Sequence, residues 1–112
     1  MADRDGVPWL AWGTPGGDQQ DQWIPQFLLR HVHCNLNMQE SIDAPAWHSE
    51  HFPGSFWPRN SRPGVLVVEG RMPKETVEEL RRRGHIVEIG DDWSEGRLVA
   101  AKREGVRRKA AA

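Results

Sequence analysis

The chain has 112 residues, which is room for one small domain. Fifteen Lys and Arg against sixteen Asp and Glu give a net charge of −1, so there is no basic field that would attract nucleic acid or an anionic membrane. The single cysteine, Cys34, excludes an intrachain disulfide and a cysteine-based metal site, and no apolar run approaches the ~20 residues of a membrane-spanning helix.

The first predicted element is a strand over residues 7–12, V-P-W-L-A-W. Asp5-Gly6 before it is typical of a two-residue hairpin turn. Only six residues precede that strand, and two of them form the turn, so we expect the first half of the hairpin to be absent. Residues 1–5 are acidic and contain no apolar run, so we expect no signal peptide; as it stands the chain would be cytoplasmic.

A helix is predicted after the turn W-G-T-P-G-G-D-Q-Q at 12–20. Its apolar stripe has the spacing i, i+3, i+4, i+7, i+8, carried by Ile24, Phe27, Leu28, His31 and Val32. The helix should begin between residues 18 and 22 and end near 34–35. Proline removes one N–H and clashes with the preceding turn, so Pro25 fits in the first turn or at a kink.

A second, short helix is predicted over residues 37–44, where Asn37 and Glu40 form a capping box. Residues 46–63 are interpreted as irregular, with a short extended piece near Trp47-His48. A strand within 64–71 follows because of its β-branched content. Pro73 then opens a helix that places Val77 and Leu80 inward, and Gly84 ends it.

A strand over 85–89 and a final hairpin over 98–111 complete the pattern, with its turn at 103–105. The order of elements predicts an α/β (α+β) chain with packed helices on a mixed or antiparallel sheet. Six Trp residues and no Tyr indicate aromatic packing against a large surface, because no basic stripe accompanies them as in a nucleic-acid platform.

The pair Gly16-Gly17 is the first candidate site. Glycines just before a helix let the backbone approach a ligand and leave N–H groups at the positive end of the helix dipole. Such a turn suits a carboxylate, a phosphate or an acyl-transfer oxyanion, and it can equally be a plain connection. Asp18 adds negative charge at the same end and is a candidate N-cap.

Histidines and nucleophiles give weaker signals. His31 and His33 face different directions on a helix, and His48 and His51 lie in an irregular segment, so we expect no metal site. No G-x-S-x-G elbow occurs. Cys34 lies at the C-terminal end of a helix, which does not lower a thiol pKa. The other hydroxyls are candidates by type only: Thr14, Ser41, Ser49, Ser55, Ser61, Thr76 and Ser94.

Four segments together resemble one family. They are P-W-L-A-W-G-T-P-G-G-D-Q-Q-D-Q-W at 8–23, F-L-L-R at 27–30, N-M-Q-E to I-D-A-P at 37–45, and D-W-S-E-G-R-L at 92–98. Their joint order is similar to the C-terminal, small-subunit part of gamma-glutamyltransferase (gamma-glutamyltranspeptidase). The resemblance extends from Asp5 to about Ala112.

The resemblance implies an N-terminal-nucleophile hydrolase fold, a four-layer αββα sandwich, of which residues 1–112 would be a single partial domain. It implies a self-cleaving precursor, a threonine nucleophile and an acyl-enzyme that transfers or hydrolyses gamma-glutamyl groups, usually of glutathione. In the family a Gly-Gly pair after a strand forms the oxyanion hole, the role implied for the backbone N–H groups of Gly16 and Gly17. No cofactor is implied.

Two departures accompany the resemblance. The family's nucleophilic threonine and its glutamate-binding segments lie upstream of the matched stretch, and its closing Arg-Gly-rich segment would begin near Ala112. We therefore expect a fragment or truncated gene product that has no turnover alone. Its partner would be the missing remainder of the enzyme, or a second copy bound through exposed strand edges. Asp18 stands where many relatives have Ser or Thr, which bears on whether glutathione is the substrate.

Two alternatives stay open. The chain could be a non-catalytic binding or interaction protein that kept this part of the fold. It could also belong to an amide acylase of the same superfamily that acts on another acyl group, such as a cephalosporin side chain. Family members are often periplasmic or extracellular, so the resemblance leaves the native compartment unknown.

Overall fold

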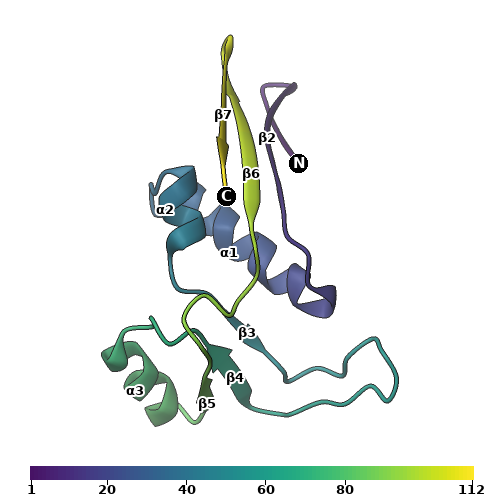
Figure 1. The fold of residues 1–112 in the computed structure, drawn as a ribbon, viewed down its shortest axis with the longest axis vertical. Coiled ribbons are helices and arrows are strands. Elements are labelled where there is room, and N and C mark those ends of the chain that lie inside the picture. The colour runs from purple at the N-terminus through teal and green to yellow at the C-terminus, as the bar shows by residue number, and fades with distance from the viewer.

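A four-stranded antiparallel sheet forms one end of the molecule (Figure 1). The computed structural model describes all 112 residues. The strand order is β1-β2-β6-β7, with β1 (Ala2–Arg4), β2 (Val7–Gly13), β6 (Val99–Glu104) and β7 (Arg107–Ala111). Strands from the two ends of the chain therefore lie side by side, and Leu10 is paired with Lys102.

The prediction that the first half of the hairpin is absent was wrong. Strand β1 pairs with β2 in antiparallel register, with Arg4 opposite Val7. Three residues suffice because Asp5 and Gly6 have φ angles of 54° and 74°, which reverse the chain in two residues. The predicted closing hairpin β6–β7 is confirmed, but its turn lies at Gly105-Val106 and not at 103–105, because β6 continues to Glu104.

Two helices cover one face of this sheet. The short 3₁₀ turn η1 (Gly17–Gln19) leads into α1 (Gln20–His33), and α2 (Met38–Asp43) follows. The apolar stripe of α1 was predicted correctly, and Phe27 is completely buried in a cluster with Leu10, Met38, Leu98 and Ala100. Pro25 lies past the first turn of α1, which continues to His33. The predicted capping box of Asn37 and Glu40 is present.

A three-stranded mixed sheet forms the other end. It contains β3 (Trp47–Ser49), β4 (Val65–Val68) and β5 (Ile86–Ile89), with β3 antiparallel and β5 parallel to β4. Helix α3 (Lys74–Arg82) crosses from β4 to β5 and buries Val77 against Leu66, Val68 and Val87. Gly84 follows the helix with φ 97°, the left-handed ending that was predicted.

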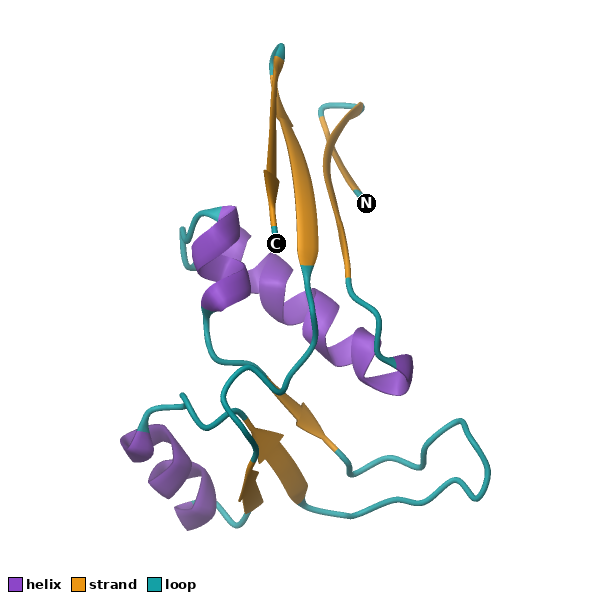
Figure 2. Cartoon of the chain, in the orientation of Figure 1, coloured by secondary structure: helices purple, strands orange, loops and turns teal.

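The two ends make an extended molecule. Its radius of gyration is 15.7 Å, whereas about 13 Å is usual for a compact domain of this length. Only 17 of 112 residues are buried. Figure 2 shows residues 50–64 as a long loop that leaves the sheet between β3 and β4. No helix combines the length and apolar character needed to cross a membrane.

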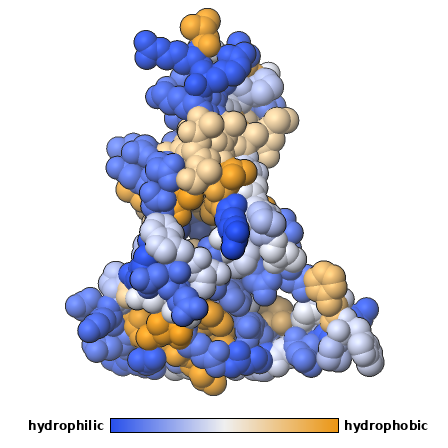
Figure 3. Space-filling view, in the orientation of Figure 1, coloured by the Kyte–Doolittle hydropathy of each residue, from blue (hydrophilic) through white to orange (hydrophobic).

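Tryptophan packing is divided. Trp23 is buried and Trp9 and Trp12 are partly buried, as the packing interpretation predicts. Trp57 and Trp93 are instead 90% and 60% exposed. Apolar colour is visible on the surface at both ends of the molecule in Figure 3. The fold class is confirmed as a mixed α+β chain with one antiparallel and one mixed sheet.

Candidate active site at the glycine turn

The glycine pair lies in the turn between β2 and η1. Gly16 has φ 136° and Gly17 has φ 60°, conformations that side chains disfavour. Both residues are exposed, and neither amide N–H donates a hydrogen bond within the chain. Two adjacent donors are thus free in front of the helix that begins with η1 and α1. Free donors at a helix N-terminal end can receive negative charge.

Trp23 supports this turn from beneath. A methyl group built on Gly16 would lie 2.4 Å from Cζ3 of the Trp23 ring, so no other residue fits there. The same ring also packs on Gly96, where a built methyl group would lie 3.1 Å from Cδ2. Trp23 is therefore held between two glycines, and its indole Nε1–H donates to Oε2 of Glu95 at 2.9 Å.

The segment around Glu95 holds the turn at a second point. The amide of Arg97 donates to Oγ1 of Thr14 at 2.8 Å, and Thr14 is only 9% exposed. The Thr14 hydroxyl donates in turn to the carbonyl of Pro15. Thr14 is therefore engaged in holding the turn in place, and residues 95–97 act as its support.

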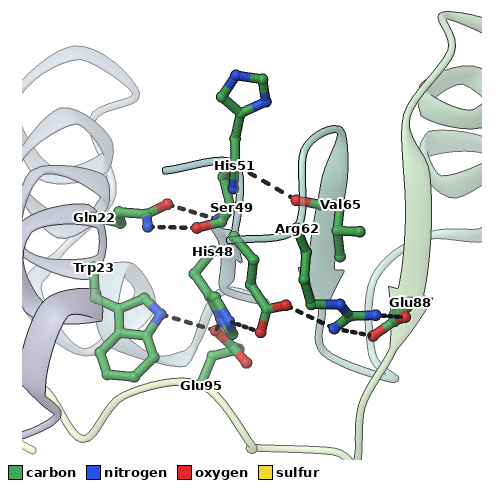
Figure 4. Close-up of polar contacts among 10 residues, drawn as sticks. Gln22, Trp23, His48, Ser49, His51, Arg62, Val65, Glu88 and Glu95 are labelled. Atoms are coloured by element: carbon green, nitrogen blue, oxygen red, sulfur yellow. Dashed lines mark hydrogen bonds and ion pairs between the residues drawn. The ribbon is translucent and has the colours of Figure 1, made fainter. Parts of the chain in front are cut away.

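His48 completes the buried network (Figure 4). Its Nδ1 lies 2.5 Å from Oε2 of Glu95, the same oxygen that accepts from Trp23. Its Nε2 lies 3.5 Å from Glu50, whose carboxylate also binds Arg62. The hydrogen bond to Glu95 raises the pKa of His48 above its ordinary value, against the opposing effect of burial. The imidazole is thereby placed between two carboxylates.

Asp18 does not cap the helix, contrary to the expectation that it could. No side-chain capping bond is present at this end. Its carboxylate instead accepts from the amide and the hydroxyl of Ser55, at 2.7 and 2.5 Å, and these bonds lower the Asp18 pKa. Loop residue Phe56 is thereby held near Gly17.

A hollow opens beside the turn, between the start of α1 and the long loop. Its lining includes Asp18, Gln22, Glu50, Gly54, Ser61 and Arg62. Gln22 fixes its inner wall because its side chain bonds both the amide and the carbonyl of Ser49. Gly16 and Gly17 are not part of this lining. The hollow is lined mainly by polar residues and lies on the Asp18 side of the glycine pair.

The other candidate residues lie apart from the turn. His31 stacks on Phe27 and bonds the carbonyl of Leu36, so it does not meet His48 or His51. His51 accepts from the amide of Gly64, and Cys34 is exposed at the end of α1. Ser41 donates to the carbonyl of Asn37. Sequence reasoning did not single out Glu95 as a member of the network behind the glycine turn; the only signal was its place in the segment D-W-S-E-G-R-L at 92–98.

Solved and curated proteins resemble this chain over most of its length. It is 34% identical over 86 residues, 77% of the chain, to the oxamate amidohydrolase proenzyme of Klebsiella pneumoniae. The structure of LmbA2991HD matches 97% of the chain with 52% identity and a TM-score of 0.88, over 20% of its own length. Gamma-glutamyltranspeptidase from Pseudomonas nitroreducens shares the fold, with a TM-score of 0.77 at 22% identity, over 99% of this chain and 53% of that one.

The matched region is a small part of the curated relatives. The chain spans about a sixth of their length. The sequence model of the gamma-glutamyltranspeptidase family matches the whole chain, residues 1–112. This match agrees with the family resemblance of the four sequence segments and with the fold. The chain belongs to the gamma-glutamyltranspeptidase family.

Proposed function

We propose that this chain supplies the oxyanion-hole amides of an enzyme that hydrolyses or transfers gamma-glutamyl groups through an acyl-enzyme. The attacking hydroxyl comes from a segment outside these 112 residues, which are a partial domain of that enzyme. The observation that carries the proposal is the pair of free, adjacent amides on Gly16 and Gly17. Their backbone is held in place by a buried tryptophan.

The chemistry needs such donors. Attack of a hydroxyl on an amide carbonyl converts its oxygen into an anion, and donors already fixed in position stabilise that charge without reorganisation. The dipole of the helix that begins behind Gly16 and Gly17 adds in the same direction. The carboxylate of Asp18 would oppose it, but its two hydrogen bonds to Ser55 direct that charge toward the loop.

A second candidate is an amide acylase for an acyl group other than gamma-glutamyl. Two observations favour it: Asp18 follows the glycine pair, and the ring of Phe56 lies beside Gly17. An acid and an aromatic ring form a different surface from the small hydroxyl residues that many relatives place after the glycine pair. The related enzyme from Klebsiella pneumoniae is named for oxamate, a different amide.

A segment exchange tests the oxyanion role. Residues 1–112 would replace the matching stretch of the Klebsiella pneumoniae oxamate amidohydrolase, and ammonia release from oxamate would be measured. We expect the exchanged enzyme to turn over. Gly16→Ala keeps its amide, but its methyl group would overlap the Trp23 ring and displace the donors, so kcat should fall by about 10²-fold, as it does when an oxyanion donor is lost. Gly105→Ala is the matched control, because Gly105 also has positive φ but has no atom near its Cβ position.

The result can go against the proposal in two ways. An exchanged enzyme that folds and matures but does not turn over contradicts it. So does a Gly16→Ala variant that keeps the kcat of its parent. The 112-residue chain alone should release no glutamate from a gamma-glutamyl anilide, and release would show that a nucleophile is present within it.

A further inference from the structure

We propose that Glu95, oriented by His48, is a positioning residue for the oxyanion turn and acts on it through Trp23. The inference rests on the proposed function of Gly16 and Gly17 and adds the residues that set their geometry. It assigns a role to the segment D-W-S-E-G-R-L at 92–98, which lies about 80 residues after the turn in sequence. None of these three side chains is proposed to touch substrate.

The contact between Trp23 and Gly16 couples the orientation of the indole ring to the position of the Gly16 backbone. The two are so close that a single methyl group on Gly16 would overlap the ring. A rotation of the indole about its side-chain bonds would therefore displace the Gly16 backbone, and the amide of Gly17 with it. Gly96 packs against the Trp23 ring as well, since a methyl group on Gly96 would also be crowded by the ring. The indole therefore has little room to rotate toward Gly96. The orientation of one side chain thus sets the direction of the two donors.

Glu95 fixes that orientation. The indole has one polar atom, and its only hydrogen bond is to the Glu95 carboxylate. The Glu95 side chain is 4% exposed, and a buried carboxylate is retained only when donors surround it. Its own backbone is anchored as well, since its amide donates to the fully buried Glu69. An anchored backbone and a bonded side chain make Glu95 a fixed reference for the ring.

His48 shares its acceptor oxygen on Glu95 with Trp23. Nδ1 of His48 and Nε1 of Trp23 meet at the same Oε2 atom, so a change in one bond alters the other. The charged groups that face or adjoin the imidazole are Glu95, Glu50 and, behind Glu50, Arg62. Glu69 and Arg71 lie behind Glu95. Loss of a proton from the His48 imidazolium changes the charge directly beside Oε2.

The direction in which stability changes with pH follows from the raised pKa of His48. A raised folded pKa means that the protonated pair contributes stability below about pH 6.5, the unfolded value. That contribution is lost as the pH rises through the folded value. The indole bond should therefore be set by an imidazolium–carboxylate pair at low pH and by a neutral imidazole at high pH.

The test follows amide and indole signals of the ¹⁵N-labelled 112-residue chain during a pH titration. We expect the Trp23 indole and the Gly16 and Gly17 amides to shift with one midpoint, that of the His48 ring. Gly105 is the reference glycine, because it has positive φ, no neighbour at its Cβ position and no histidine beside it in sequence. His48→Gln should abolish the shared midpoint, and His85→Gln, at an exposed position, should leave it unchanged.

Two substitutions at Glu95 distinguish a change in the geometry of the glycine turn from a loss of folding. Glu95→Gln keeps an oxygen acceptor for the indole without its charge, so the turn signals should stay near their native values and lose their pH response. Glu95→Ala removes the acceptor and should displace the Gly16 and Gly17 amides. Trp93→Phe is the matched tryptophan control, since Trp93 is largely exposed and stacks on Arg71.

The proposal is overturned if the glycine amides do not follow the His48 midpoint in the unmodified chain, a measurement that needs no variant. It is also overturned if Glu95→Ala moves the indole signal and leaves the glycine signals in place. Neither of these two measurements requires an active enzyme. If the Gly16 and Gly17 amides follow the His48 midpoint but the exchanged enzyme does not turn over, Glu95 positions the turn and the oxyanion assignment is wrong. If the exchanged enzyme turns over but the two amides do not follow His48, only the positioning role of Glu95 is rejected.

Discussion

The two ends of the molecule are built from different kinds of contact. The terminal region, which consists of β1, β2, α1, α2, β6 and β7, pairs strands from opposite ends of the chain. The central region, which consists of β3, β4, α3 and β5, is assembled within residues 47–89. Closing a long loop loses more chain entropy than closing a short one, so the terminal region needs the stronger core. It has that core in Phe27 and Leu10, which are almost fully buried.

The candidate site lies where these regions meet. Trp23 belongs to the terminal region, His48 to the central region, and Glu95 to the connection between β5 and β6. Each region therefore contributes a side chain to the network behind the glycine turn. A substitution that destabilises the core of one region should change the geometry of the glycine turn only if the two regions unfold together. The following experiments measure that coupling.

The largest effect is expected from Phe27→Ala in the terminal region. The side chain has no exposure and packs against Trp12 and His31, so its removal leaves a cavity. Such losses reach roughly 3–5 kcal/mol in free energy of unfolding, most of the stability of a small domain. Urea unfolding followed by circular dichroism should show it. Val32→Ala, at a half-exposed position of the same helix, should have little effect, and equal effects would contradict the assigned core.

A smaller effect is expected from Val77→Ala in the central region, about 2 kcal/mol by the same reasoning. Val77 is 4% exposed and joins α3 to β4 and β5. Hydrogen exchange should accelerate in β4 and β5 and stay unchanged in β2 and β6 if the regions open separately. Equal acceleration in both sheets would show that they form one cooperative unit. Glu78→Ala, on the exposed side of α3, is the control.

Much of the fold could be predicted because it depends on local patterns. The apolar stripe of α1, the capping box at Asn37 and the strand–helix–strand unit over residues 65–89 each depend on residues close in sequence. The first strand, β1, was missed because its three residues carry no periodicity, and pairing with β2 decides their structure. Nothing local indicated that β2 pairs with β6 across most of the chain.

The candidate site was predictable only in part. A glycine pair before a helix is a local signal, and Gly16 and Gly17 were named from it. The support beneath them depends on Trp23 and Glu95, which are 72 residues apart. The sequence does not distinguish a buried glutamate or histidine from an exposed one. Only the tertiary structure therefore reveals that Glu95 and His48 share a hydrogen-bond network. The use of Asp18 was missed for the same reason.

The smallest effect concerns Asp18, which links the terminal region to the long loop of the central one. Its hydrogen bonds to Ser55 lower the Asp18 pKa below the ordinary 3.8. A depressed folded pKa means that the link is complete above the unfolded value and is lost as the pH falls through the lower folded value. The carboxylate is fully exposed, so solvent screens it and the global stability should hardly change.

The local effect should nevertheless be visible in the exchange of one amide. Protection of the Ser55 N–H should be present at pH 6, fall below about pH 3.8, and be weak and independent of pH in Asp18→Asn. Gly54 is the internal control, because its N–H bonds Asn60 within the loop and does not involve Asp18. If Ser55 keeps full protection in the variant, the loop is held by its own contacts, and the two regions are joined through Trp23, His48 and Glu95 without help from the loop.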